Sequence, residues 1–419
     1  MTTTLLPQEG PVAGTPAPTV GDHVRDYLAR VRGGDLGSLP AVIGLTVLCL
    51  TFATARPVFF SAANFANLFT QGAAVTVIAM GLIFVLLLGE IDLSAGFASG
   101  VCATVLANVV SVLGYPWYVA VLAAIATGVL IGLTIGFLVA KVGIPSFLVS
   151  LAGFLAFQGI VLLLMKEGTN ISIDDKVIIA IENNYVPPTL GWLLAAVAVT
   201  GYGIGQFLRH RNRANRGLVT EPVAVVTARV AGLALLLGSA VHVLNAERSI
   251  NTLISSTKGM PVVVPLIGAL LVFWTFVLNR TAYGRHLYAV GGNPEAARRA
   301  GINVDRLKIS AFVICSAMAA VGGIIAASKD RSVDPNTGGS NVLLYAVGAA
   351  VIGGTSLFGG KGRMINAVLG GAVVAVIING MGLLDLSSGL KYTSTGLVLL
   401  LAAGVDALSR RRSVAAGTR

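Results

Sequence analysis

The sequence predicts an all-α polytopic membrane protein with about twelve transmembrane helices, some of them broken or re-entrant. Only 11% of its 419 residues are charged, whereas soluble domains average about 25%. Hydrophobic residues make up 55% of the chain and gather in apolar runs of about 17 to 25 residues, the length that crosses a bilayer as a helix. Among the 51 glycines, Gly128, Gly132 and Gly136 form two overlapping G-x-x-x-G steps. This stripe either forms a helix-packing face or reflects the general abundance of glycine in membrane helices.

Each apolar run is interpreted as one helix, and the glycine-rich run near 341–358 is the weakest. Together the runs define a membrane domain over 39–408. Residues 1–38 are rich in Thr, Pro and Gly, which predicts a mobile cytoplasmic tail and not a cleaved signal peptide. Residues 409–419 are expected to form a cytoplasmic C-terminal tail. The runs lie near 39–55, 71–89, 96–113, 117–139, 145–165, 189–208, 224–244, 262–279, 307–327, 341–358, 364–384 and 391–408.

The net charge of +11 indicates membrane topology and not nucleic-acid binding. With twelve crossings and a cytoplasmic N-terminus, most of the 29 Lys and Arg residues fall on the cytoplasmic side, as the positive-inside rule requires. Omitting the run near 341–358 would place the basic cluster 410–412 outside, so we keep it and expect both termini inside. The basic run 209–216 lies at the tip of a predicted added hairpin over 189–244. There it fixes orientation, or contacts anionic lipid or a partner subunit.

Several patterns argue against catalysis by this chain. The stretch 355–362, T-S-L-F-G-G-K-G, has Thr355 where a phosphate-binding loop needs its first Gly, and Gly362 where the loop needs a Ser or Thr to ligate magnesium. Asp174 and Asp175 form an acidic pair without the second carboxylate cluster that a metal would need. The three cysteines lie in apolar runs and lack metal-ligand or disulfide spacing. We therefore expect no ATP hydrolysis by the chain itself and no cofactor, and an integral membrane enzyme is the least favoured alternative.

Glu90 and Asp92 stand apart from the other acidic residues because they interrupt the hydrophobic sequence in G-E-I-D-L-S-A-G, residues 89–96. The segment contains no Lys or Arg and has a Gly at each end, which predicts a buried break in the helical structure. An ionised carboxylate near the bilayer centre costs roughly 2.5–3.5 kcal/mol, so such acids usually have a role. Three interpretations remain open: lining or gating a pathway together with Ser94, capping of the next helix by Asp92 or Ser94, or a proton relay.

Residues 288–302, Y-A-V-G-G-N-P-E-A-A-R-R-A-G-I, predict a short and fully capped helix on a loop between apolar runs. Asn293 suits the N-cap, Pro294 suits the first helical position, and Glu295 complements the positive end of the helix dipole. Two arginines precede Gly301, which is a stop signal. Because a helix of fewer than two turns is marginal in water, the pattern indicates docking to a partner. An ordinary capped loop helix is the alternative.

This loop resembles the EAA-type coupling loop of permeases in ATP-binding cassette (ABC) importers. It has the G-G-N-x-E-A-A-R-x-x-G-I-N-V form found in permeases for ribose, xylose and related sugars. Three further stretches agree with that family: S-A-A-N-F-A-N-L at 61–68, G-E-I-D-L-S-A-G at 89–96, and V-I-G-G-T-S-L-F-G-G at 351–360. The likeness therefore extends from about residue 40 to the C-terminus.

The resemblance implies a permease subunit of a bacterial plasma membrane that forms a homodimer within membrane lipid. It would receive a monosaccharide, D-xylose or a related sugar, from an extracytoplasmic binding protein, and alternate access while two ABC ATPase subunits close and open. The cytoplasmic coupling loop would be 280–306. The residues expected to contact the ATPase are Asn293, Glu295, Ala296, Ala297, Arg298 and Gly301.

A path for a neutral sugar calls for hydrogen-bonding amides and hydroxyls and does not need strong charge. Each amide in or beside an apolar run could line that path or bond a neighbouring helix instead. The candidates are Asn64, Asn67, Gln71, Asn108, Gln158 and Asn379.

An ion-coupled secondary sugar transporter is the main alternative function. It would bind a proton or a sodium ion at an embedded acid such as Glu90 or Asp92. It gives no reason for the capped helix over 293–301.

Overall fold

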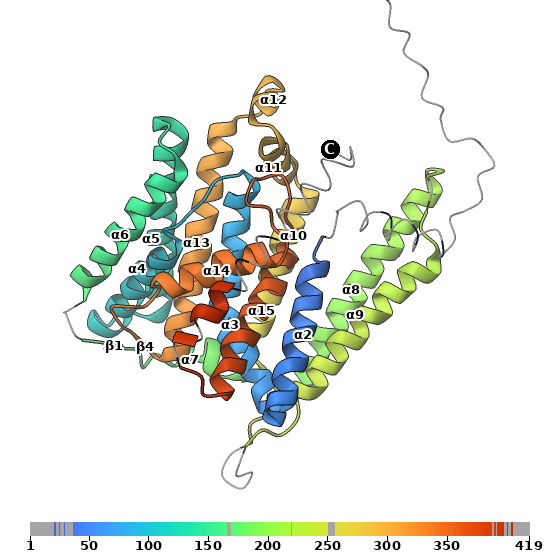
Figure 1. The fold of residues 1–419 in the computed structure, drawn as a ribbon, viewed down its shortest axis with the longest axis horizontal. Coiled ribbons are helices and arrows are strands. Elements are labelled where there is room, and N and C mark those ends of the chain that lie inside the picture. The colour runs from blue at the N-terminus through green and yellow to red at the C-terminus, as the bar shows by residue number, and fades with distance from the viewer. Residues whose placement is uncertain are drawn as a thin grey trace, which may run out of the picture.

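The computed structural model describes residues 37–165, 169–218, 220–249 and 256–387, together with positions 21, 25, 29, 389–390, 392–397, 400 and 404. Most of both predicted tails and most of the last predicted span lie outside these residues. The long helices run between two ends of the molecule, with α12 at one of them (Figure 1). The helices are α2 (Leu39–Ala55), α3 (Ala62–Leu87), α4 (Ala95–Ala107), α5 (Trp117–Phe137), α6 (Ser146–Leu164), α7 (Lys176–Asn183), α8 (Pro188–Asn215), α9 (Val223–Leu244), α10 (Val263–Arg280), α11 (Ala282–Gly292), α12 (Pro294–Arg299), α13 (Val304–Asp330), α14 (Ser340–Ile352) and α15 (Met364–Leu383).

Nine helices in the described part of the chain are long and apolar enough to cross a membrane, which confirms an all-α polytopic membrane protein. For this purpose α4 and α5 each continue into a π-helical turn, Asn108–Val112 and Leu138–Val142. Two shorter apolar helices, α2 and α14, have 17 and 13 residues and match the predicted runs near 39–55 and 341–358. A helix of 13 residues is only about 20 Å long, less than the roughly 30 Å hydrocarbon core. The total of twelve crossings therefore stays a prediction.

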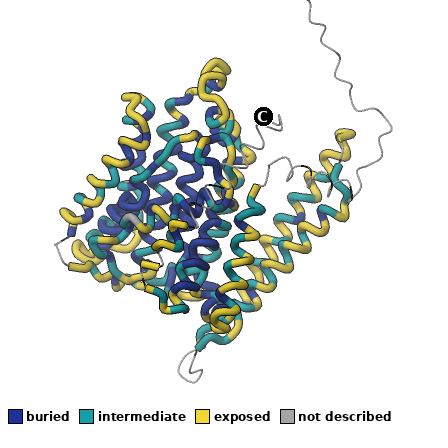
Figure 2. Tube along the Cα trace, in the orientation of Figure 1, coloured by how far each residue is buried: buried dark blue, intermediate teal, exposed yellow. Residues whose placement is uncertain are grey.

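The core is built on α3 and α13, which run antiparallel and pack along their length. Small residues bring the two backbones together: Gly81 of α3 faces Cys315 and Met318, and Gly322 of α13 faces Ile78. Figure 2 shows this buried centre, whereas few residues of the outer helices α6, α8, α9 and α10 are buried. Because those exposed surfaces are apolar, they suit contact with lipid.

The predicted glycine stripe of α5 is a packing face against α13. Gly128 faces the Ser316 carbonyl, Gly132 the Phe312 carbonyl, and Gly136 the backbone at Ile309. A Cβ atom added at Gly132 would lie 2.5 Å from the carbonyl oxygen of Phe312, closer than real Cβ contacts. Only glycine allows this approach, so the prediction of a helix-packing face is confirmed.

Two units of the core repeat one arrangement in opposite directions. In the first, α3 is followed by a non-helical break at 88–94 and then by the short helix α4. In the second, α13 is followed by a non-helical segment at 331–339 and then by the short helix α14. Correspondingly, α5 packs on α4 and α13, and α15 packs on α14 and α3. Since α3 ends beside α11 whereas α13 begins beside α12, the two units have inverted topologies, an arrangement known in transporters.

Two short strand pairs and α7 lie at the end of the molecule opposite α12 (Figure 1). Strand β1 (Ile171–Ser172) pairs antiparallel with β4 (Ser332–Val333), and β2 (Tyr185–Val186) pairs antiparallel with β3 (Met260–Pro261). Asp175 caps α7, because its Oδ1 accepts the N–H groups of Val177 at 2.9 Å and Ile178 at 3.0 Å. One member of the acidic pair noted in the sequence is thus a helix cap. Helix α7 was not predicted from the sequence, since its eight residues give no apolar run of spanning length.

Helices α8 and α9 pack on each other as a hairpin over the stretch 188–244. Helix α8 continues to Asn215, beyond the predicted end near 208. The extension contains the basic run, and cations near a helix C-terminus are favoured by the helix dipole.

Candidate functional site

The helix α12 forms as the sequence predicts, from local signals alone. The Oδ1 atom of Asn293 accepts the N–H of Ala296 at 3.0 Å, and Pro294 occupies the first helical position. Glu295 lies in the first turn, where a negative charge complements the dipole. Gly301 ends the helical segment with φ +83°, a left-handed conformation that favours glycine.

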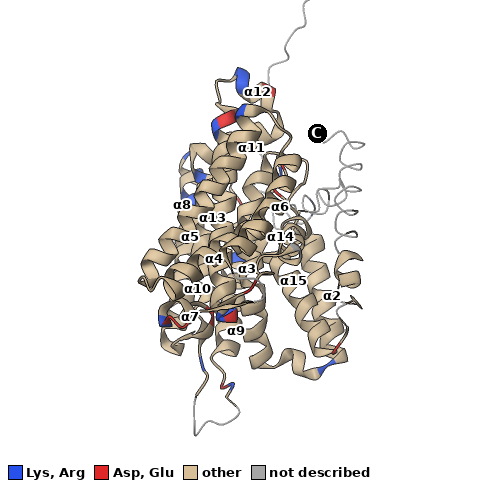
Figure 3. Cartoon of the chain, turned by 90° about the vertical axis from the view of Figure 1, so that its left-hand side faces the viewer, with Lys and Arg blue, Asp and Glu red and all other residues tan. Residues whose placement is uncertain are grey.

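The helix α12 projects from one end of the bundle (Figure 1). Of its residues only Ala297 is buried, and it packs on the main hydrophobic core. The side chains of Glu295 and Arg298 are 71% and 57% exposed. Charged residues gather toward the two ends of the molecule, and a cluster of them lies at α12 (Figure 3). The helix thus offers a polar, accessible surface on a small apolar anchor.

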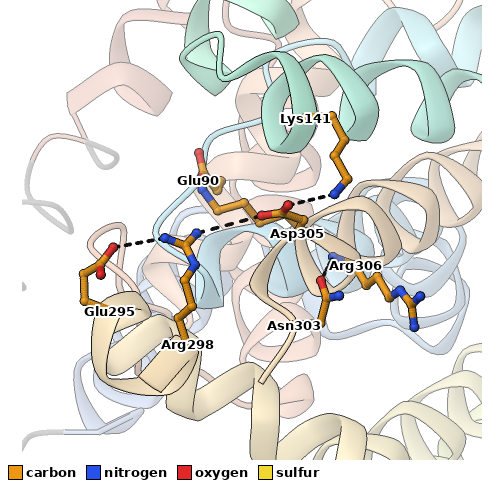
Figure 4. Close-up of polar contacts among 8 residues, drawn as sticks. Glu90, Lys141, Glu295, Arg298, Asn303, Asp305 and Arg306 are labelled. Atoms are coloured by element: carbon orange, nitrogen blue, oxygen red, sulfur yellow. Dashed lines mark hydrogen bonds and ion pairs between the residues drawn. The ribbon is translucent and has the colours of Figure 1, made fainter. Parts of the chain in front are cut away.

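A row of ion pairs connects α12 with its neighbours (Figure 4). Arg298 lies 3.2 Å from Glu295 and 3.9 Å from Asp305 in the first turn of α13. Asp305 in turn accepts a 2.9 Å bond from Lys141, which follows α5. Exposed ion pairs contribute only about 0–1 kcal/mol each, so the row orients α12 more than it stabilises it.

A second, more buried ion pair connects α13 with the broken segment at 88–94. The Nζ atom of Lys308 lies 2.5 Å from Oε1 of Glu90, and their side chains are 24% and 16% exposed. Lys308 is one helical turn from Asp305, so α12 and the break contact the same end of α13. The structure therefore brings together two features that are about 200 residues apart in the sequence.

Leu88, Asp92 and Ser94 of the broken segment are buried, and the backbone of the segment is bonded by side chains of α6. Ser146 accepts the N–H of Ile91 at 3.2 Å, and Ser150 donates to the carbonyl of Ile91 at 3.3 Å. These bonds satisfy backbone groups that α3 and α4 leave free, which is the requirement for irregular backbone at membrane depth. Neither serine was predicted from the sequence, where the available signal is two hydroxyls one turn apart after Pro145.

Asp92 is 1% exposed within this segment. Its Oδ1 accepts the N–H of Ser94 at 2.9 Å and the hydroxyl of Ser94 at 2.6 Å. Its Oδ2 has no N–H or O–H partner among the described residues, and the thiol of Cys315 is a neighbour. Ser94 precedes α4 without a side-chain capping bond of its own. Asp92 therefore shapes the turn into α4 and keeps one carboxylate oxygen available.

Two glycine-rich segments pack against the end of α3 next to the break. Gly291 at the end of α11 packs against the carbonyl of Leu87, and the N–H of Gly360 donates to the same carbonyl at 2.9 Å. The Tyr288 hydroxyl donates to the carbonyl of Gly362 at 2.7 Å. The turn at 353–363 includes the stretch 355–362, which departs from the phosphate-binding loop pattern, and it is thus part of this site's backbone packing.

The amide candidates do not converge on one place. Asn64 and Asn379 are buried and bond each other twice at 2.8 Å, near the end of the bundle opposite α12. Gln71 is half-buried and its Oε1 has no partner in the described part of the chain, whereas Asn67 is exposed. Asn108 donates to the carbonyls of Thr104 and Leu164, and Gln158 is exposed. Within the described residues, no group of three His, Cys, Asp or Glu side chains forms a metal site.

The architecture and the projecting α12 define a helical membrane protein of the permease class. A family model described as the permease component of branched-chain amino acid transport systems matches residues 64–403. The chain belongs to this permease family.

Its relatives identify the part of the family in which it lies. The xylose transport system permease protein of Escherichia coli K12 is 36% identical over 356 residues, which cover 85% of this chain and 87% of the relative. The protein of the same description from Haemophilus influenzae Rd is 32% identical over 88% of this chain and 96% of the relative. The ribose import permease protein of Escherichia coli K12 is 29% identical over 87% of this chain and 92% of the relative. The chain thus groups with ribose and xylose permeases. No solved structure matches it.

Proposed function

We propose that this chain is the membrane-spanning permease subunit of an ATP-driven sugar importer. The observation that carries the proposal is α12, a six-residue helix that is capped at both ends and exposed on its charged side. So short a helix needs a partner to hold it, and an ATPase subunit with a groove for a polar helix is that partner. The ATPase would contact Asn293, Glu295 and Arg298, while Ala297 anchors the helix to the permease.

The ion pairs supply a route from the ATPase to the membrane. Movement of α12 acts on the first turn of α13 through Arg298 and Asp305, and one turn further Lys308 holds Glu90 of the break. A shift of α13 therefore moves the break relative to α6, whose serines bond Ile91. In the proposed mechanism Glu90, Asp92 and Ser94 control access from the cytoplasmic end, and the permease works as a homodimer.

The proposed substrate is a monosaccharide, D-xylose or a related sugar. The named relatives transport xylose or ribose, and a neutral polyol suits a path lined by amides and hydroxyls. An extracytoplasmic binding protein would deliver the sugar to the end that carries α7 and the strand pairs. Asn64 and Asn379 bond each other, and Asn108 bonds two helix carbonyls. Of the amides on α3, Gln71 and Asn67 are therefore proposed for the path.

One observation favours an ion-coupled secondary transporter instead. Asp92 is buried and one of its oxygens lacks an N–H or O–H partner, as a proton-binding site requires. A secondary transporter needs no second protein, so this function does not explain the exposed surface of α12.

Reconstitution distinguishes the two functions. The chain is placed in proteoliposomes with its ATPase and binding protein, and uptake of labelled D-xylose, D-ribose and D-glucose is measured with and without ATP. We expect uptake only with ATP and both partners, and the greatest rate for a pentose. Uptake by the chain alone on a proton gradient would reject the ABC importer.

A charge exchange tests the proposed route. Lys308→Glu and Glu90→Lys should each reduce ATP-driven uptake at equal membrane abundance, and the double variant should recover it in part, because the pair is restored in reverse. Lys258→Gln is the control, since it removes an ion pair with Glu247 that shares no residue with the route. If the double variant transports no better than the single variants, the pair does not couple α13 to the break.

A further inference from the structure

A basic cavity lies between the tip of the α8–α9 hairpin and the end of α10. Its volume is about 480 Å³. Five arginines line it, and they come from separate parts of the chain: Arg209, Arg213 and Arg216 from α8 and its C-cap, Arg229 from α9, and Arg280 from the last position of α10. The cavity is thus built by the fold and is not merely the basic run seen in the sequence.

The charges around this cavity are unbalanced. Glu221 is its one acidic lining residue, and both of its oxygens bond Arg229, at 2.7 and 3.3 Å. The other four arginines form no ion pair with any described residue. Several guanidinium groups that face one concave space raise the local concentration of anions and hold phosphate oxygens by paired N–H donors.

The position of the cavity along the membrane normal favours a lipid headgroup over a free phosphate as the bound group. Helix α8 has 28 residues, about 42 Å, so its last two turns extend beyond a hydrocarbon core of about 30 Å. Ile204, Phe207 and Leu208 precede the arginines on α8 and are exposed and apolar, as expected against acyl chains. The arginines therefore lie at the level of lipid headgroups, where juxtamembrane basic groups attract anionic lipid.

We propose that this cavity binds the phosphate of an anionic phospholipid and that the bound lipid bridges the α8–α9 hairpin to α10. Arg280 lies next to Thr281, the N-cap of α11, so the bridge would secure the hairpin to the root of the segment that carries α12. The lipid site is independent of the transported substrate and of ATP coupling.

Binding is tested on the purified, delipidated full chain in nanodiscs of phosphatidylcholine with increasing phosphatidylglycerol, by native mass spectrometry and thermal melting. We expect retained phosphatidylglycerol and a raised melting temperature, and no such effect of added phosphatidylcholine. Arg213→Gln and Arg280→Gln should each weaken phosphatidylglycerol retention roughly fivefold. Arg211→Gln is the matched control, because Arg211 carries the same charge on the same turn of α8 and does not line the cavity. It should change retention less than twofold.

Arg280→Gln is the decisive variant, since Arg280 is distant in sequence from the basic run. If Arg211→Gln weakens retention as much as Arg213→Gln and Arg280→Gln do, the effect is general surface charge and the site is rejected. Inorganic phosphate forms the second arm: full displacement of the lipid by millimolar phosphate would assign the cavity to a soluble phosphate and overturn the lipid proposal. Equal retention of both lipids would overturn it as well.

Discussion

Glu182 of α7 is a buried carboxylate that the proposed transport mechanism does not use. It is 4% exposed, and neither of its oxygens has a hydrogen-bond partner among the described residues. Burial raises the pKa of Glu182 from 4.5 to about 8, with the charge of Lys329 opposing the rise and that of Asp330 adding to it. At neutral pH the folded protein therefore holds this side chain as the neutral acid. The neutral form lets α7 pack on the end of α13, where the Ser328 hydroxyl accepts the N–H of Glu182 at 3.1 Å.

We predict that Glu182→Gln stabilises the protein at high pH. Between about pH 4.5 and 8 the folded state keeps a proton that the unfolded state releases, so the free energy of unfolding falls by roughly 1.4 kcal/mol for each unit of rising pH. The amide removes this dependence. Thermal melting in detergent from pH 5 to 8.5 measures it, with the exposed Asp174→Asn as control. Parallel loss of stability in wild type and Glu182→Gln would show that the carboxyl is already ionised when folded.

The residues of α12 give a prediction about coupling without unfolding. Gly301→Val places a β-branched side chain at φ +83°, a local strain of about 1–3 kcal/mol just after a helix of only six residues. Glu295→Ala removes an exposed ion pair worth only about 0.3–0.5 kcal/mol, so it leaves the permease itself stable. Both variants should insert and melt like wild type, copurify less ATPase, and show lower sugar-stimulated ATP hydrolysis. Ala300→Val is the matched control, since the neighbouring residue has φ −81°. Normal ATPase binding and uptake in both variants would make α12 an ordinary loop helix.

The sequence predicted the α12 residues well because caps act within four positions of the chain. It predicted the Glu90 and Asp92 break for a similar reason, as glycines and acids in an apolar context are local signals. It did not predict that Lys308 pairs with Glu90, or that Ser146 and Ser150 bond Ile91. Those contacts join elements far apart in the chain, and lysine or serine alone carries no information about a distant partner.

At the scale of elements, close backbone contact between α5 and α13 organises the core. We predict that Gly132→Ala destabilises the protein by about 1–3 kcal/mol, because the new Cβ would meet the carbonyl of Phe312 and the backbone of Val313 at 2.5 Å. Gly268→Ala in α10 is the matched control: its Cβ meets no atom within 4 Å, and alanine favours the helix. Melting temperature and yield in detergent measure the difference. Equal melting of the two variants would mean that α5 shifts without cost.

The inverted relation between the α3 and α13 units was not apparent in the sequence. Each unit needs a long helix, a break and a short helix, but many apolar sequences satisfy those needs. The first break reads L-G-E-I-D-L-S and the second reads R-S-V-D-P-N-T-G-G, and the two share no motif beyond a single aspartate. The short α14 also explains why the run near 341–358 is the weakest of the predicted spans, since its 13 residues follow a break within the core.

At the scale of the whole molecule, basic residues gather at the end that carries α12. Lys141 lies at this end, where it bonds Asp305 of α13. The tip of α8 lies there as well, since it lines one cavity together with Arg280. Arg280 belongs to the loop 280–306 that the sequence predicts to be cytoplasmic. The fold therefore places these basic residues at one end of the molecule, as expected if that end faces the cytoplasm under the positive-inside rule. The predicted basic cluster 410–412 lies outside the described residues, so the sidedness of the C-terminus stays a prediction.

The topology gives the last prediction. Single cysteines are introduced at Asn212 on the α8 tip, at Ala300 after α12 and at Ser172 in β1, after the three native cysteines are replaced by serine. All three positions are exposed. Ala300 is used in the α12 loop because the nearby Asn303 caps α13 and its replacement would remove that cap. In intact cells an impermeant maleimide should label only Ser172→Cys, because β1 lies at the end opposite α12. After permeabilisation it should label all three. Labelling of Asn212→Cys and Ala300→Cys from outside, with Ser172→Cys protected, would show that the protein has the opposite orientation in the membrane. In that orientation α12 would face the side of the membrane that lacks ATP, so it could not couple to an ATPase.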